Sequence, residues 1–114
     1  MHELSIAMEI LHIVVKTAGE NGSTSVKTIN LKVGDLSGVE VDSLSFSFDA
    51  IKGENEVTGG SELVIKKVPV VVRCADCDDE FETKERFLAC PACTGFDTLM
   101  LQGDELSITD IEVE

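Results

Sequence analysis

The sequence predicts an α+β fold of two helices and a small sheet, with a zinc-ribbon-like β module inside the chain. Three observations predict it. Apolar residues recur at helical spacing over residues 4–18 and alternate at strand spacing over 28–33, and the only four cysteines form two CxxC pairs, Cys74-Ala-Asp-Cys77 and Cys90-Pro-Ala-Cys93. At 114 residues, the chain is one domain by length, or a small domain that carries a metal-stabilised module.

The first predicted element is an amphipathic helix over residues 4–18. Its apolar positions, three or four residues apart, are Leu4, Ala7, Met8, Leu11, Val14 and Val15. We expect this helix to end near Gly19. A strand with one buried face should follow, because Ile29, Leu31 and Val33 alternate with polar residues.

A second helix is predicted after the loop 34–38. The residues that fit one helical face are Val41, Leu44, Phe48 and Ile51. Leu44, Phe46 and Phe48 also alternate as a strand would, so the local pattern permits both structures. We favour the helix, with Asp42 or Ser43 as its N-cap.

The second half of the chain is rich in strand signals. Residues 63–73 hold many β-branched side chains, but Pro69 cannot donate to a sheet ladder, so the strand should lie at an edge or bend there. Residues 78–89, between the cysteine pairs, are enough for a short hairpin that brings both pairs together. A last strand over 106–113, with a bulge near Asp110, is expected to return to the first sheet.

Net charge and composition exclude some classes of binding partner. The chain has 9 Lys plus Arg against 22 Asp plus Glu, a net charge of -13, and neither Trp nor Tyr. Phosphate backbones and anionic lipids would be repelled and few rings could stack on bases, so we expect neither nucleic acid nor membrane as a partner. No apolar run approaches the roughly 18 residues of a membrane span and no secretory leader is evident, so we expect a cytoplasmic protein.

The four cysteines predict one metal site. Zinc accepts four thiolates at about 2.3 Å, and a two-residue gap lets both sulfurs of a pair reach one ion. Reducing conditions favour metal binding over disulfides for paired CxxC motifs. Four thiolates leave no open position for water or substrate, so the site should be structural. A disulfide framework and a one-iron centre of the rubredoxin type are the alternatives.

A second candidate metal site lies at the N-terminus. The Met1 amine and the amide and ring nitrogens of His2 can close fused chelate rings around one ion, and Glu3 can add its amide or carboxylate. Such nitrogen-rich sets favour Ni(II) or Cu(II), and the residues alone do not choose between them. The plainer interpretation of His2 is a solvated terminal residue, and His12 should be an ordinary exposed helix residue. No catalytic constellation or phosphate-binding loop is evident, so we do not expect an enzyme.

Four segments, in their order and spacing, carry a family resemblance. They are the start Met1-His2-Glu3-Leu4-Ser5-Ile6-Ala7, the middle Val33-Gly34-Asp35-Leu36-Ser37-Gly38-Val39-Glu40, the two CxxC pairs, and the ending Gly103-Asp104-Glu105-Leu106. Together they resemble the HypA family of hydrogenase maturation nickel chaperones. The resemblance implies two helices packed on a small three-stranded sheet, with an inserted zinc-ribbon-like β module. It also implies a nickel-binding domain of residues 1–72 plus 99–114 and a zinc-binding domain of residues 73–98.

The resemblance further implies a nickel metallochaperone that binds Ni(II) at its N-terminus. By position, the nickel ligands are the Met1 amine, His2 and the Glu3 backbone, and Glu40 occupies a place where the family can carry an acid near the nickel. The implied zinc ligands are Cys74, Cys77, Cys90 and Cys93. Some family members have histidines flanking the zinc cysteines, but this chain has none there, so no pH-driven exchange of zinc ligands is expected.

The partners that the resemblance implies are the GTPase HypB and the precursor of the [NiFe]-hydrogenase large subunit, which receives the nickel. Association of the chain with itself is compatible with the sequence. Two other functions remain as alternatives from the residues alone: a structural zinc-ribbon adaptor protein, and a rubredoxin-like one-iron electron carrier.

Overall fold

The computed structural model describes residues 3–83 and 89–114, and the chain forms two compact units. The first unit contains the residues up to Lys32 together with Val39–Lys66 and Ser107–Glu114, and the second contains Val33–Gly38 and Lys67–Leu106. The assignment of residues 73–98 to a zinc-binding domain and of the rest to a nickel-binding domain stays a prediction.

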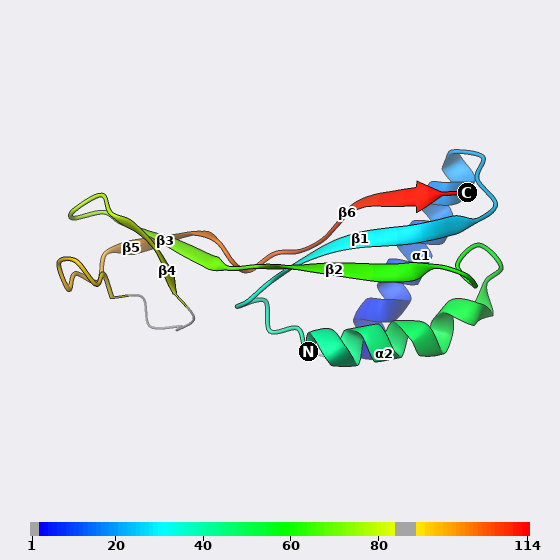
Figure 1. Cartoon of the computed structure of the whole chain (residues 1–114), viewed down its shortest axis with the longest axis horizontal. Coiled ribbons are helices and arrows are strands. Elements are labelled where there is room, and N and C mark those ends of the chain that lie inside the picture. The colour runs from blue at the N-terminus through cyan, green and yellow to red at the C-terminus, as the bar shows by residue number, and fades with distance from the viewer. Residues whose placement is uncertain (1–2, 84–88) are drawn as a thin grey trace. The chain divides into compact units, whose positions relative to one another are not determined.

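The first unit is built on a three-stranded sheet with the strand order β2-β1-β6. Its elements are α1 (Glu3–Glu20), β1 (Val26–Gly34), α2 (Val41–Ile51), the short 3-10 helix η1 (Lys52–Glu54), β2 (Glu62–Val68) and β6 (Leu106–Val113). β1 and β2 run in the same direction and are joined through α2, whereas β6 runs antiparallel to β1 (Figure 1). The predicted α+β fold, and the return of the last strand to the first sheet, are confirmed.

The core of the first unit lies between the helices and the sheet. α1 buries a stripe at helical spacing, and β1 buries alternate residues beneath it. The fully or nearly fully buried residues of this core are Ala7, Ile10, Val14 and Ala18 of α1, Val26, Ile29 and Leu31 of β1, and Leu44 and Phe48 of α2. α1 runs one residue past Gly19, and the backbone N–H of Ser23 closes its end by donating to the Ala18 carbonyl at 2.8 Å.

The ambiguous segment 41–51 is a helix, as predicted. Leu44 and Phe48, four residues apart, are both buried, while Phe46 between them is 77% exposed, which is the outcome of helical and not strand periodicity. The predicted N-cap at Asp42 or Ser43 is wrong. The N-cap is Glu40, two residues before Asp42, and it makes no side-chain capping bond. Asp42 lies in the first turn, where its charge favours the helix dipole.

The strand predicted over 63–73 is divided at Pro69. Residues before it form β2 of the first sheet, and residues after it form β3 (Val70–Cys74) of a second sheet. Pro69 has no N–H to donate, and its carbonyl accepts a hydrogen bond from the Gln102 side-chain amide at 3.0 Å. The expected break in the strand is therefore confirmed, and one continuous stretch of chain supplies strands to two sheets.

The second unit contains a three-stranded antiparallel sheet with the order β4-β3-β5, formed by β3, β4 (Glu80–Thr83) and β5 (Thr98–Gln102). β3 and β4 form a hairpin whose turn contains the first cysteine pair. The hairpin expected within residues 78–89 stays a prediction, because residues 84–88 lie outside the described part of the chain. The pairing of β3 with β5 has an irregularity between Val71 and Val72. The bulge expected near Asp110 stays a prediction.

The second unit also contains a close approach of two glycines. The Gly34 N–H donates to the Glu105 carbonyl at 2.7 Å, and the Leu36 N–H donates to the Gly103 carbonyl at 2.7 Å. A Cβ atom added to Gly34 would lie 2.2 Å from the carbonyl carbon and oxygen of Gly103. The backbones at these two positions therefore leave no space for a side chain. Within residues 3–83 and 89–114, no helix has the length and apolar character needed to cross a membrane.

Candidate metal centres

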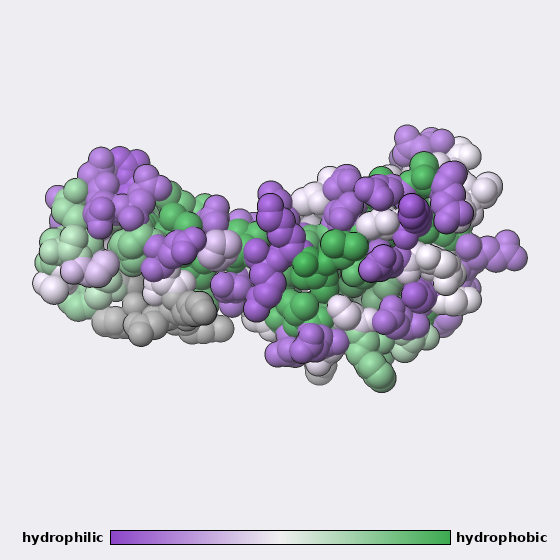
Figure 2. Space-filling model, viewed as in Figure 1, coloured by the Kyte–Doolittle hydropathy of each residue, from purple (hydrophilic) through white to green (hydrophobic). Residues whose placement is uncertain are grey.

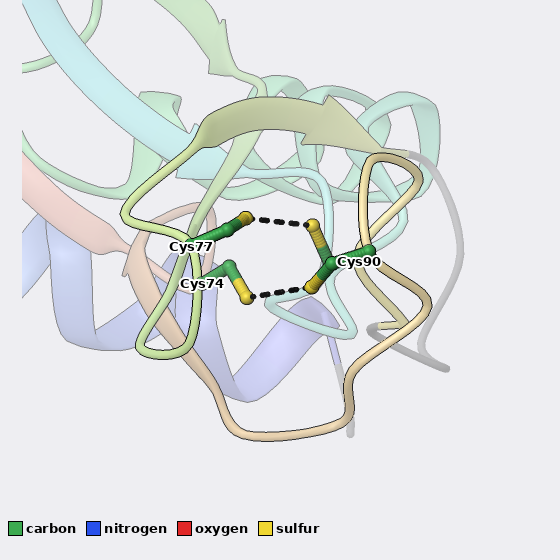
Figure 3. Close-up of side chains that lie close together, drawn as sticks. Cys74, Cys77 and Cys90 are labelled. Atoms are coloured by element: carbon green, nitrogen blue, oxygen red, sulfur yellow. Dashed lines mark hydrogen bonds between the residues drawn. The ribbon is translucent and has the colours of Figure 1, made fainter.

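The structure brings the four cysteines together in one cluster. Their sulfur atoms all lie within 4.8 Å of one another, and Cys74 Sγ lies 3.5 Å from Cys93 Sγ, as Cys77 Sγ does from Cys90 Sγ. The side chains point toward a common centre (Figure 3). A tetrahedron with zinc–sulfur bonds of about 2.3 Å has sulfur–sulfur edges of about 3.8 Å. The cluster therefore has the size and donor set that suit a structural zinc ion.

Each CxxC pair forms a turn that its own backbone closes. In the first turn, the Cys74 N–H donates to the Asp79 carbonyl at 2.9 Å, and the Asp78 N–H donates to the Cys74 carbonyl at 2.8 Å. Asp78, which follows the second cysteine, has a positive φ of 62°. The turn holds both sulfurs of the pair on the side where the second pair lies.

The second turn repeats this pattern with different residues. The Cys90 N–H donates to the Gly95 carbonyl at 2.9 Å, and the Thr94 N–H donates to the Cys90 carbonyl at 2.8 Å. Thr94 has a φ of 59°, at the position equivalent to Asp78. Each turn has one buried cysteine, Cys74 or Cys90, and one exposed cysteine. Two equivalent half-sites thus supply the four donors.

Backbone amides around the cluster affect the thiols. A hydrogen bond from the Asp79 N–H lowers the pKa of Cys77. The hydrogen bond between the Cys77 and Cys90 thiols, burial, and the other two cysteines outweigh this effect and raise the pKa of Cys77 to about 12. Burial raises the pKa of Cys90, but the N–H groups of Cys93 and Ala92 together with neighbouring thiols lower it to about 7. Backbone N–H groups therefore favour the thiolate form at both positions, whereas burial opposes it.

The left-handed backbone at Thr94 yields a stability prediction. A β-branched residue with positive φ is strained, and the left-handed region costs an L-residue about 1–2 kcal/mol. Thr94→Gly is therefore expected to raise the free energy of unfolding of the zinc-loaded protein by about 1 kcal/mol, measured by chemical denaturation.

Asp78→Gly is the matched variant at the equivalent position of the first turn. It should give less stabilisation, because Asp tolerates this conformation better and because Asp78 accepts hydrogen bonds from Arg73, at 2.7 Å from its Nε. Destabilisation by Thr94→Gly would contradict the proposed strain.

The predicted N-terminal metal site is described only in part. Met1 and His2 lie outside the described residues, whereas Glu3 is half-buried at the start of α1. The backbone N–H of Glu40 donates to Glu3 Oε2 at 3.5 Å, so two candidate residues from distant parts of the sequence lie side by side. His12 is exposed on α1, as predicted. Spacing along the sequence gave no signal for the Glu3–Glu40 contact.

Sequence comparisons identify relatives of this chain. A family model described as hydrogenase/urease nickel incorporation, metallochaperone, HypA matches residues 1–113. The chain is 40% identical over 114 residues to the hydrogenase maturation factor HypA of Chlorobaculum parvum, with 100% of both chains covered. It is 42% identical over 113 residues to the factor of the same name of Chloroflexus aurantiacus, with 98% of both covered.

Two solved structures have the same fold as this chain. The chain matches the solution structure of the Ni metallochaperone HypA from Helicobacter pylori with a TM-score of 0.70 at 21% identity, covering 99% of this chain and 97% of that one. A second solution structure, of a HypA protein, matches with a TM-score of 0.75, also at 21% identity, over 100% of this chain and 97% of that one. Together with the family match over residues 1–113, these findings show that the chain belongs to the HypA family of nickel metallochaperones, a non-catalytic family of hydrogenase maturation.

Proposed function

We propose that the chain binds Ni(II) through the Met1 amine, His2 and the Glu3 backbone, and delivers it to the precursor of the [NiFe]-hydrogenase large subunit. The observation that carries this proposal is the family match, which begins at residue 1 and so includes the segment that bears these donors. The relatives named above are hydrogenase maturation factors, which favours a hydrogenase as the recipient. We propose HypB as the GTPase partner and the cytoplasm as the location.

The contact between Glu3 and Glu40 supports a role for Glu40 near the proposed nickel site. Glu3 begins α1 and its carboxylate accepts from the Glu40 N–H, so Glu40 lies next to the one candidate nickel residue that the structure describes. The exposed Glu40 carboxylate is then available as a nearby negative charge for a divalent ion. In this proposal, Glu40 assists the site and does not replace one of the three donors.

Metal donors at a chain terminus can also explain how the protein releases nickel. An amine of pKa about 8 and an imidazole of pKa about 6.5 bind the metal only when deprotonated, so protons compete with nickel as the pH falls. Terminal donors can leave the ion one at a time, which suits a protein that must surrender its cargo. The zinc centre, held by four thiolates from two closed turns, is suited to retention instead.

His2→Ala tests the nickel site. We expect it to weaken Ni(II) binding by more than about 100-fold in calorimetry, since even the loss of a residue that only supports a metal ligand costs 10- to 100-fold. Extra residues before Met1 should have a similar effect, because they remove the free amine. Zinc content should stay unchanged in both proteins.

His12→Ala is the matched control, because the chain has two histidines and His12 is exposed on α1. It should bind nickel like the unaltered protein. Equal weakening by His12→Ala, or unchanged affinity in His2→Ala, would refute the proposed site. A nickel ion found at the four thiolates would refute it as well.

A further inference from the structure

The sheet of the second unit has two faces of opposite character. The strand register puts Arg73 opposite Glu80 on one side and Leu99 on the other, and Val71 opposite Glu82. Directly opposed residues in antiparallel strands share a face, as do alternate residues of one strand. The face so defined, here called the outer face, consists of Val71, Arg73, Glu80, Glu82 and Leu99, and the exposed Leu101 lies at the irregularity where Val71 pairs with Gln102.

The inner face is packed and the outer face is not. On the inner face, Val70, Val72 and Cys74 of the central strand are all 0% exposed. On the outer face, Leu99 is 63% and Leu101 46% exposed. Large apolar side chains that stand together on an exposed sheet face are typical of a surface that binds another element.

The outer face divides lengthwise into an apolar half and an acidic half. Val71 of β3 with Leu99 and Leu101 of β5 form the apolar half, and Glu80 and Glu82 of β4 form the acidic half. β4 and β5 lie on either side of β3, so the strand with Glu80 and Glu82 lies about 10 Å from the strand with Leu99 and Leu101, which is the width of one α-helix. A single helix laid along the strands would cover both halves.

The charges on the outer face favour a partner with positive charge. Among the described residues of this face, Arg73 is the one cation; it pairs with Asp78 and lies opposite Glu80, so the described acidic side chains outnumber the cations there. Hydrophilic side chains also gather over the turn between β3 and β4 (Figure 2), where Asp76, Asp78 and Asp79 are exposed. An acidic segment would be repelled. A second copy of this chain, with a net charge of -13, would be repelled as well.

We propose that the outer face binds a basic amphipathic helix of a partner protein. Apolar side chains of the helix pack on Leu99, Leu101 and Val71, and Lys or Arg on its flank reaches Glu80 and Glu82. A hollow of about 300 Å³ beside Leu99, lined by Arg73, Ala75 and Asp78, has room for one large apolar side chain of the helix. The interaction is separate from the nickel ligands, so it provides recognition without occupying the cargo site.

The test uses the full zinc-loaded chain and an 18-residue amphipathic helical peptide of leucine and lysine. Leu99→Ser with Leu101→Ser is expected to raise the Kd of the peptide at least tenfold in calorimetry. The control is Leu4→Ser with Met8→Ser, which alters two side chains of α1 that are 50% and 57% exposed, and should change the Kd less than twofold. Amide shifts in NMR should concentrate in β3, β4 and β5.

A second pair of variants tests the role of the acidic side chains, and each variant removes two negative charges. Glu80→Gln with Glu82→Gln should weaken binding at least fivefold, whereas Glu9→Gln with Glu20→Gln, both on exposed positions of α1, should not. Equal weakening by the α1 variants, or equal binding of a leucine–glutamate peptide, would overturn the proposal. So would sedimentation showing a dimer that only the Leu99→Ser, Leu101→Ser protein loses, because the face would then bind a second copy. Zinc content and nickel affinity, measured on every variant, verify the fold and are independent of this proposal.

Discussion

Cys74→Ala is expected to unfold the second sheet, because zinc binding is the largest stabilising contribution in that unit. Structural zinc sites contribute roughly 10–16 kcal/mol in small modules, whereas a typical protein has only about 5–15 kcal/mol of total stability. Among the three strands of this sheet, the fully buried residues are Val70, Val72 and Cys74. A core of two valines beside the metal ligand cannot offset the loss of the ion. Chelation of zinc from the unaltered protein should have the same effect.

The measurement is the set of NMR amide signals from β3, β4 and β5, which should collapse to unfolded positions in Cys74→Ala. Ala75→Ser is the control, because Ala75 lies in the same turn but is exposed and supplies no ligand. That variant should keep both zinc and the signals. Retention of the dispersed signals in Cys74→Ala, with zinc absent by elemental analysis, would show that packing alone maintains the sheet.

Gly34→Ala is expected to cost about 3 kcal/mol or more of folding free energy, because its methyl group would collide with backbone. The added Cβ would lie 2.2 Å from the Gly103 carbonyl and 2.6 Å from the Asp104 nitrogen. Backbone atoms cannot rotate away as a flexible side chain does, and overpacking of this kind typically costs about 1–3 kcal/mol even where side chains can adjust. Relief would require breaking the hydrogen bonds of Gly34 with Glu105 and of Leu36 with Gly103.

Gly19→Ala provides the comparison for this prediction. An added Cβ at Gly19 meets nothing within 4 Å, and the residue lies in α1, where alanine is favoured over glycine by about 0.5–1 kcal/mol. Chemical denaturation of the two variants should therefore give shifts of opposite sign. A Gly34→Ala protein as stable as the unaltered chain would mean that the two glycine backbones separate readily.

The elements with strong periodicity could be predicted from the sequence. The spacing of Ala7 and Val14 predicted α1, and the alternation of Ile29 and Leu31 predicted β1, because one face of each element is buried. The cysteine spacing predicted the cluster, since two CxxC turns are a compact means of bringing four sulfurs to one ion. Pro69 marked the change of sheet for a covalent reason, the missing N–H.

Other features depend on contacts that no local pattern encodes. α2 begins at Val41, and Glu40 serves as its N-cap without the side-chain bond that capping preferences assume. Thr94 and Asp78 hold left-handed conformations where glycine would have given a signal. The exposure of Leu99 beside Arg73 required the strand register, because an apolar residue in a strand is equally compatible with a buried face.

The equivalence of the two cysteine turns has a consequence for how the zinc centre assembles. Each turn is closed by its own backbone bonds, so each can offer two sulfurs before the other arrives, and capture of the ion by one pair can precede chelation by the second. Bringing the pairs together across the twelve intervening residues costs about 2 kcal/mol of chain entropy. That is a small fraction of the roughly 10–16 kcal/mol released on coordination. Assembly is therefore strongly downhill once the first two bonds have formed, because coordination outweighs the chain entropy several-fold.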